Sequence, residues 1–278
     1  FEPRMSAKYS FSDHLSLAAS WGIMKKLPTL IHLYPDPMYA DYQTSAKTDA
    51  HGVQSCTFTT HLIKGVTNPD IKLPSTNNME ITAVSKLPVA TLTLTFYNEH
   101  LSNGYGFKTR VEPYRVETAA PDTTFAKYYT PRNNIKHEKW GIEYIIDFAR
   151  IAPLNMSIYV DGAYMHILRT DTETEQTYEH SLFNGRLRSV AAEVLSSNSW
   201  YNVTQNDRLN TNARFIIHIP RFALVATIKA QGVWIDRTKR MSKYNNEDMA
   251  YINTSDNRVN VNPVYLIDKN GNNIPFSS

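Results

Sequence analysis

Threonine alternates with apolar residues along one segment near the centre of the N-terminal half, Pro88–Tyr97. Ala90, Leu92, Leu94 and Phe96 alternate there with Thr91, Thr93 and Thr95. A period of two places successive side chains on opposite faces of an extended chain, as in a half-buried β-strand. We therefore predict a strand at Pro88–Tyr97 and expect Leu94 to point into a core.

Similar β-rich runs occur along most of the chain. Further strands are predicted at Val53–Val66, Glu80–Val84, Tyr105–Val111, Trp140–Ile151, Ala213–Ile219, Phe222–Ile235 and Val259–Ile267. Asp161-Gly162 predicts a hairpin turn between Met156–Val160 and Ala163–Leu168. We interpret Asn103–Gly106 as another turn, and Lys269–Asn272 as a turn near the end of the chain. Because strands follow strands without intervening helices, antiparallel sheets are expected.

Two helices and two long loops complete the expected organisation. An imperfect helical stripe predicts a short helix from His14 to Met24, and a regular one predicts a helix from Leu187 to Leu195. Polar, proline-punctuated residues 113–139 and acidic residues 170–180 are expected to be loops. We predict an all-β fold, an antiparallel β-sandwich of jelly-roll type, in residues 53–278. Residues 1–52 would form an N-terminal arm containing the short helix.

Several functional classes are excluded by what the 278 residues lack. The single cysteine, Cys56, allows neither an intramolecular disulfide nor a four-cysteine zinc site. No apolar run approaches the roughly 18 residues of a membrane span, so we expect none. Zinc-protease, nucleophile-elbow and phosphate-loop motifs are absent, and we expect no enzyme.

Clusters of acidic residues leave calcium binding as one alternative. Acidic clusters occur at Asp36 and Asp41, and again at Glu247, Asp248, Asp256 and Asn257. Calcium prefers six to eight oxygen ligands, but the EF-hand spacing is missing. Calcium at subunit interfaces therefore remains possible, plain loop chemistry is the alternative, and no other cofactor is expected.

The formal net charge of +3 is too small to establish a nucleic-acid partner, but cations gather locally. Arg237, Lys239, Arg240 and Lys243 lie within seven residues, with Tyr244 beside them. Such cations could neutralise phosphates while the tyrosine stacks on a base. Arg186 and Arg188 form a weaker pair of the same kind. The alternative is a solvated loop at the end of a strand.

Aromatic residues are dense in the segment 113–139. The relevant side chains are Tyr114, Phe125, Tyr128 and Tyr129. Exposed aromatics at this density are typical of a partner surface, so we predict subunit contacts here. The alternative is that the rings hold a long loop against a sheet.

The pattern over roughly residues 50–270 resembles the shell domain of small icosahedral virus capsid proteins. These domains are rich in Thr, Asn, Pro and Tyr, are poor in Cys, and carry long loops between strands. The resemblance implies a protein of the virion that self-assembles into an icosahedral shell. Its partners would be copies of itself, other capsid subunits and the viral RNA or DNA genome. A first residue other than Met, Phe1, would fit a trimmed arm or polyprotein cleavage.

Two other functions remain open. A β-sandwich attachment module would bind a glycan or receptor through an aromatic groove containing Tyr128, Tyr129, Trp140, Trp200 and Tyr201. A viral movement protein would instead coat single-stranded nucleic acid cooperatively. A high-mass closed assembly would distinguish the capsid hypothesis from both.

Overall fold

The computed structural model describes residues 2–64, 66–116, 122–183, 186–194, 201–244, 247–248, 252–253, 259–260 and 265–275. Within these residues the fold is all-β with antiparallel sheets, as predicted, and it contains one short helix, α1 (Leu30–Leu33). No helix in the described ranges is long and apolar enough to cross a membrane.

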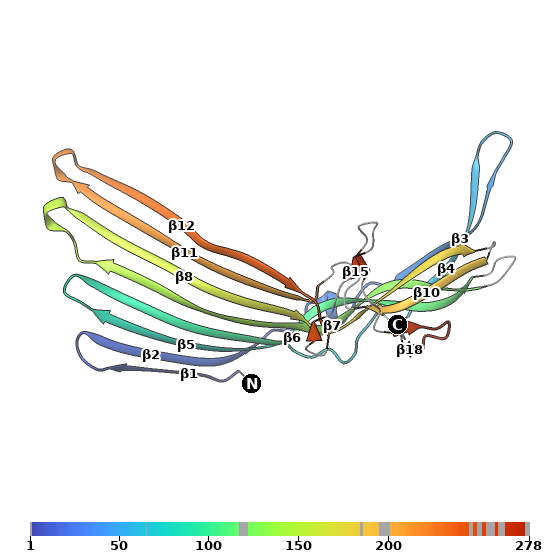
Figure 1. Cartoon of the computed structure of the whole chain (residues 1–278), viewed down its shortest axis with the longest axis horizontal. Helices are drawn as coiled ribbons and strands as arrows, with labels where there is room; N and C mark the ends of the chain where they lie inside the picture. Colours follow the sequence, from blue (N-terminus) through green and yellow to red (C-terminus); the bar gives the residue numbers. More distant parts are fainter. Residues whose placement is uncertain are drawn as a thin grey trace.

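The largest element is an eight-stranded sheet in the order β1-β2-β5-β6-β7-β8-β11-β12. Its strands are β1 (Arg4–Ser10), β2 (Leu15–Lys25), β5 (Ser75–Lys86), β6 (Ala90–Val116), β7 (Asp122–Phe148), β8 (Met156–Asp171), β11 (Val203–Ile219) and β12 (Leu224–Met241). Four hairpins therefore lie side by side, with their turns at the same end (Figure 1). The order is an up-and-down meander, so the jelly-roll topology is not confirmed.

A second body is built around the far ends of β6 and β7. A four-stranded sheet in the order β18-β17-β10-β9 and a hairpin of β3 and β4 join it (Figure 1). The strands are β3 (Met38–Thr48), β4 (Gln54–Ile63), β9 (Glu175–Phe183), β10 (Arg186–Val194), β17 (Tyr265–Ile267) and β18 (Asn273–Pro275). Four two-residue strands and two single-turn helices complete the described elements: β13 (Lys243–Tyr244), β14 (Glu247–Asp248), β15 (Ile252–Asn253), β16 (Val259–Asn260), η1 (Ala152–Leu154) and η2 (Pro220–Phe222).

The two hydrophobic clusters that the described residues form both lie in this second body. On one face of the β6–β7 ribbon, Tyr114, Val116 and Ala126 pack with Ile63 and Val66 from the β4 region. On the opposite face, a second cluster contains Val111, Phe125, Ala191 and Ile267. Residues 114 and 111 differ by an odd number, so their side chains point to opposite sides of one strand. The ribbon is thus covered on both sides here.

The predicted loop 113–139 is wrong, because its described residues belong to β6 and β7. Pro113 pairs with Phe125, and Pro131 pairs with Phe107. Proline removes a backbone donor and is tolerated mainly in edge strands. Past the point where β5 and β8 stop pairing, the ribbon has only two strands, so each is an edge and accommodates proline. The expected loop 170–180 shrinks for a similar reason: β8 ends at Asp171 and β9 begins at Glu175.

Both predicted helices are also wrong. His14–Met24 is mostly strand β2, which pairs with β1 and β5, and Leu187–Val194 lies in strand β10. Apolar spacing in a short segment fits either period, and pairing with neighbouring strands decides between them. Residues 4–25, expected in an N-terminal arm, consequently form one margin of the large sheet.

Two predicted turns lie inside strands. Asp161-Gly162 is in the middle of β8, where Gly162 pairs with Tyr144 and Thr211. Asn103–Gly106 is part of β6, where the register with β7 shifts. In contrast, the turn at Lys269–Asn272 is confirmed, with Gly271 at a φ of 85°. The strands predicted at Pro88–Tyr97, Ala213–Ile219 and Phe222–Ile235 are confirmed as strand, but each is part of a longer element. β6 continues to Val116, β11 begins at Val203 and β12 ends at Met241.

Candidate functional site

One face of the eight-stranded sheet is apolar in its outer half, between the hairpin turns and the second body. Residues paired across strands share a face, so the register gives rows of side chains. The row through Phe96 contains Ala7, Ala19, Ile81, Phe96, Ile142, Tyr164, Leu209 and Ile235. The row through Leu92 contains Leu15, Ser85, Leu92, Ile146, Val160, Ala213 and Ala230. We call this side, with the Leu94 row between those two, the apolar face.

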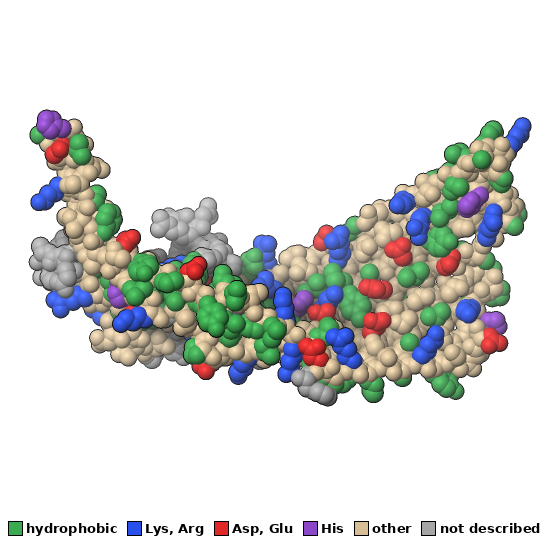
Figure 2. Space-filling model, turned by 180° about the vertical axis from the view of Figure 1, so that it is seen from behind, with side chains coloured by type: hydrophobic (Ala, Val, Ile, Leu, Met, Phe, Trp, Pro, Cys, Tyr) green, Lys and Arg blue, Asp and Glu red, His purple; other side chains and the backbone are tan. Residues whose placement is uncertain are grey.

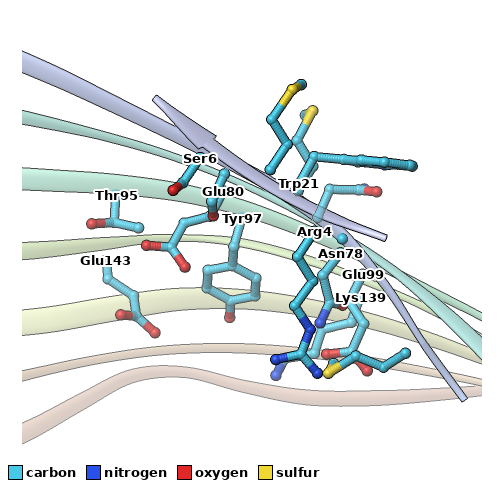
Figure 3. A pocket seen from close by; sticks show the side chains of 16 residues that line it. Arg4, Ser6, Trp21, Asn78, Glu80, Thr95, Tyr97, Glu99, Lys139 and Glu143 are labelled. Carbon is cyan, nitrogen blue, oxygen red and sulfur yellow. The ribbon is translucent and has the colours of Figure 1, made fainter. Parts of the chain in front are cut away.

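The opposite side, which we call the polar face, is defined by the alternate residues. Its row through Thr95 contains Lys8, Ala18, Thr82, Thr95, Glu143, Ala163, Asn210 and Val233. Figure 2 views the large sheet from a side on which acidic and basic side chains are interspersed. Figure 3 shows both directions at once: Trp21 extends from the sheet opposite to Tyr97 and Glu143. The sheet is therefore amphipathic.

No described element covers either face of the outer half (Figure 1). Leu94, which the alternation placed in a core, is 44% exposed. The facing of Leu94 was predicted correctly, but its burial was not, because the second layer of the expected sandwich is absent over the described hairpins. A sheet with one apolar face ordinarily buries that face against another layer. The apolar face is therefore a surface that requires a partner.

An open groove of about 650 Å³ lies on the polar side of β1, β2, β5, β6 and β7. Glu80, Glu99 and Glu143 line it together with Tyr97 and Lys139 (Figure 3). The Lys139 ammonium lies 5.1 Å from the centre of the Tyr97 ring. Burial raises the pKa of the Tyr97 hydroxyl, and the Glu143 and Glu99 carboxylates raise it further. The groove carries both signs of charge and holds Tyr97 in its neutral form.

A buried carboxylate marks the inner limit of the apolar face. Asp207 is 3% exposed and accepts hydrogen bonds from Tyr164 at 3.1 Å, Gln205 at 3.0 Å and Arg237 at 3.2 Å. His166 Nδ1 lies 2.7 Å from its Oδ1 atom. The hydrogen bond with His166, followed by that with Gln205, holds the pKa of Asp207 well below its usual value, although burial opposes this shift. Asp207 therefore stays charged and ties β8, β11 and β12 together.

The two outer strands of the sheet, β1 and β12, each have one described neighbour. Strand β12 is 18 residues long, contains no proline, and is exposed along nearly its whole length. Exposed apolar residues on it include Val225, Ile228, Val233 and Trp234. Natural sheets usually protect such edges with proline, short strands or a covering segment. A long, apolar, uncovered edge is a site for strand pairing.

The predicted cationic cluster does not form one surface. Arg237 and Lys239 project on the side of Asp207, whereas Arg240 projects on the polar side, because side chains alternate along β12. Arg237 also forms an ion pair with Asp207, and Arg240 stacks 4.8 Å from the ring of Tyr201. Lys243 and Tyr244 belong to the short strand β13, and the side chain of Tyr244 lies outside the described part. Nucleic-acid binding by this set stays a prediction.

The remaining predicted residues separate into two groups. Arg186 and Arg188 lie in β10, paired with Phe183 and Ser181, and their side chains lie outside the description. Tyr114 and Phe125 are buried within the subunit, so predicting them as subunit contacts was wrong. The reason is that both faces of the ribbon are covered there. Tyr128 packs at the edge of the first cluster, and Tyr129 is exposed.

Among the described residues, no group of three or more His, Cys, Asp or Glu side chains is arranged to hold a metal ion. Part of the predicted acidic cluster, Asp256 and Asn257, lies outside those residues. The chain matches no protein-family model, no curated protein and no solved structure.

The apolar face itself was missed from the sequence. The signal was present in β2, where Leu15, Leu17, Ala19, Trp21 and Ile23 alternate with smaller or more polar residues. Read with a period of two, this segment predicts an amphipathic strand rather than the helix that we expected.

Proposed function

We propose that this protein is a structural subunit that assembles with copies of itself, with strand β12 of one copy pairing with strand β1 of the next. The observation that carries this proposal is the pair of sheet edges at β1 and β12, which no second strand of the described chain covers. Self-association also agrees with the expectation drawn from the sequence. The backbone groups along an edge supply affinity, as in other cases in which a strand is added to a sheet.

The number of strands supports continuation of the sheet. Every adjacent pair in the large sheet is antiparallel, and the sheet has eight strands. Strands β1 and β12 therefore run in opposite directions. A second copy related head-to-tail would pair its β1 antiparallel to β12, which repeats the pattern inside the subunit. Head-to-tail contacts close into a ring when the rotation between copies permits and otherwise form a filament.

A viral shell enclosing a genome is the specific form that the capsid resemblance implies. What supports this form is the composition and the presence of cations such as Lys8, Lys139 and Arg214 on the polar face. A jelly-roll subunit belongs to the same proposal, although the meander order gives it no support. The general proposal of an edge-to-edge assembly stands without the shell, and nuclease-protected nucleic acid in purified particles would establish the specific form.

The assembly is tested by light scattering and negative-stain microscopy of the protein and of two proline variants, Thr227→Pro and Ile228→Pro. Along an antiparallel strand, neighbouring backbone N–H groups point to opposite sides. One variant therefore loses a bond to β11 and melts earlier, while the other removes a donor only from the free edge. The variant that loses only the free-edge donor is expected to keep its melting temperature and to be monomeric where the wild type assembles.

The matched control is Thr48→Pro, in the β3–β4 hairpin away from both edges of the large sheet. It should assemble as the wild type does. A monomeric wild-type protein at all concentrations, or unchanged assembly in both β12 variants, would contradict the proposal.

A further inference from the structure

The turns of the four long hairpins carry exposed apolar residues. Phe11 lies in the first turn, Leu87 and Val89 in the second, Leu154 in the third and Phe222 in the fourth. Val89 is 68% exposed and Phe222 is 72% exposed. Turns in water are usually polar because their backbone and side chains are solvated. All four turns lie at one end of the sheet (Figure 1), so they form one apolar rim.

Aromatic side chains mark the opposite limit of the apolar face. The centre of the Trp140 ring lies 5.4 Å from the ring centres of both Tyr164 and His166. Trp21 and Trp140 occupy one row of the register, and Trp234 donates a hydrogen bond to Thr211 two rows nearer the rim. Asp207 lies in the same row as Trp140, and Gln205 in the next row away from the rim, so the face becomes polar from this level on. Tryptophan and tyrosine prefer the boundary between water and lipid, because one end of each ring is apolar and the other polar.

The height of this apolar band is that of a bilayer core. In β11 it extends from Leu209 to Ile219. Eleven residues at about 3.4 Å each span roughly 35 Å along the strand. A strand inclined at about 45° crosses the hydrocarbon of a bilayer with 9–11 residues. The apolar band, which lies between the rim and the aromatic boundary, therefore has the length that an inclined strand needs to cross the hydrocarbon of a bilayer.

A second copy packed face to face explains these features less well than lipid does. Such packing would cover the rows through Leu92 and Phe96, but it would leave the four turns in water. Lys86, Arg150 and Arg221 stand next to three of the apolar turns, and the Arg221 guanidinium lies 5.9 Å from the Phe222 ring. Cations beside apolar residues suit a surface of anionic lipid headgroups.

We propose that the apolar face and the four hairpin turns of the large sheet bind the hydrocarbon of a lipid bilayer that contains anionic lipid. This inference rests on the proposed edge-to-edge assembly in one respect: free backbone groups at β1 and β12 would be costly in hydrocarbon, and neighbouring copies would pair them. The polar face and its groove would remain in water, and the second body would lie outside the lipid.

The test is flotation of the full chain with vesicles of phosphatidylcholine and phosphatidylglycerol, with tryptophan emission recorded in parallel. The wild type should float, and its emission should shift to shorter wavelength as the tryptophans on the apolar side enter the boundary region. Leu94→Glu places a charge in the centre of the apolar face, and vesicle binding should fall by at least about ten-fold.

The control is Thr93→Glu, which adds the same charge to the adjacent residue of the same strand but on the polar face. Its binding should stay within about two-fold of the wild type, because that face remains in water. Equal loss in both variants, with both still folded by circular dichroism, would overturn the assignment of the lipid-binding face.

Cross-linking of the floated protein separates this inference from the proposed assembly. Protein that assembles in solution but does not float overturns lipid binding and leaves the assembly proposal standing. Protein that floats only as a monomer supports lipid binding and contradicts assembly. Protein that floats as an oligomer supports both.

Discussion

The ring of Tyr144 lies over Gly162 in the neighbouring strand and occupies the space in which a Cβ atom would stand. The Tyr144 hydroxyl lies 2.6 Å from Thr211 Oγ1 on the next strand, which holds the ring in place. A similar contact occurs on the polar face, where the ring of Tyr97 lies over Gly141. Aromatic rings that cover glycines in adjacent strands fill the gap left by the missing side chain.

Gly162→Ala should therefore destabilise the protein by about 1–3 kcal/mol, because the added methyl overlaps the Tyr144 ring. The measurement is the free energy of unfolding in urea. Gly232→Ala is the matched control: its added Cβ would lie 3.3 Å from a Trp234 ring atom, which the exposed ring can relieve by moving slightly. Similar losses in both variants would contradict the role given to Tyr144.

Asp207→Asn should lower the free energy of unfolding at pH 7 by about 1–3 kcal/mol, because several donors lose a charged acceptor. The pKa of Asp207 is lowered in the folded protein, chiefly by His166. Its stabilising contribution is thus present above the pKa of the unfolded chain, about 4, and is lost as the pH falls below that value.

The difference between wild type and Asp207→Asn should consequently shrink as the pH falls from 5 to 2, which thermal melts at several pH values would show. Asp161→Asn, on the polar face, is the control and should change stability by less than about 0.5 kcal/mol. A difference that stays constant over this pH range would disprove the proposed charge on Asp207.

Lys108 is fully buried in the β6–β7 ribbon, and its ammonium lies 2.7 Å from Asp171 Oδ2. Asn134 donates a second hydrogen bond to the same carboxylate. Lys108→Met should cost about 3–5 kcal/mol, since it leaves Asp171 without its cation at the junction of β8 and β9. Lys47→Met, in the exposed part of β3, should be nearly neutral. Urea unfolding of both variants measures the contrast, and equal effects would refute it.

Phe125→Ala should cost about 3–5 kcal/mol, because Phe125 is 2% exposed and belongs to a buried cluster. Leu94→Ala should cost less than about 1 kcal/mol in the isolated subunit, since Leu94 is already largely in contact with solvent there. Differential scanning calorimetry of the unassembled protein distinguishes the two. A large loss for Leu94→Ala would mean that the apolar face is covered within a single subunit.

The sequence by itself indicated strand within β5, β6, β7, β8, β11 and β12 of the large sheet, and which side chains of a strand share a face. The alternation at Pro88–Tyr97 placed Leu94 and Thr93 on opposite sides of β6, because side-chain direction in a strand follows directly from the pleat. Sequence patterns were ambiguous at His14–Met24 and Leu187–Leu195, where short apolar runs fit two periods. They failed at Asp161-Gly162, where packing under Tyr144 rather than a turn explains the glycine.

Only the tertiary structure decided what lies against each face. The alternation of apolar and polar residues predicts that a strand has an apolar side. Which layer covers that side depends on contacts between residues far apart in the chain. In the second body, residues of β10 and β17 cover Val111, and residues of β4 cover Tyr114. Over the outer hairpins the described chain supplies none, and the same pattern of residues becomes a surface for a partner. Pairing between distant strands, which local propensity does not encode, made that difference.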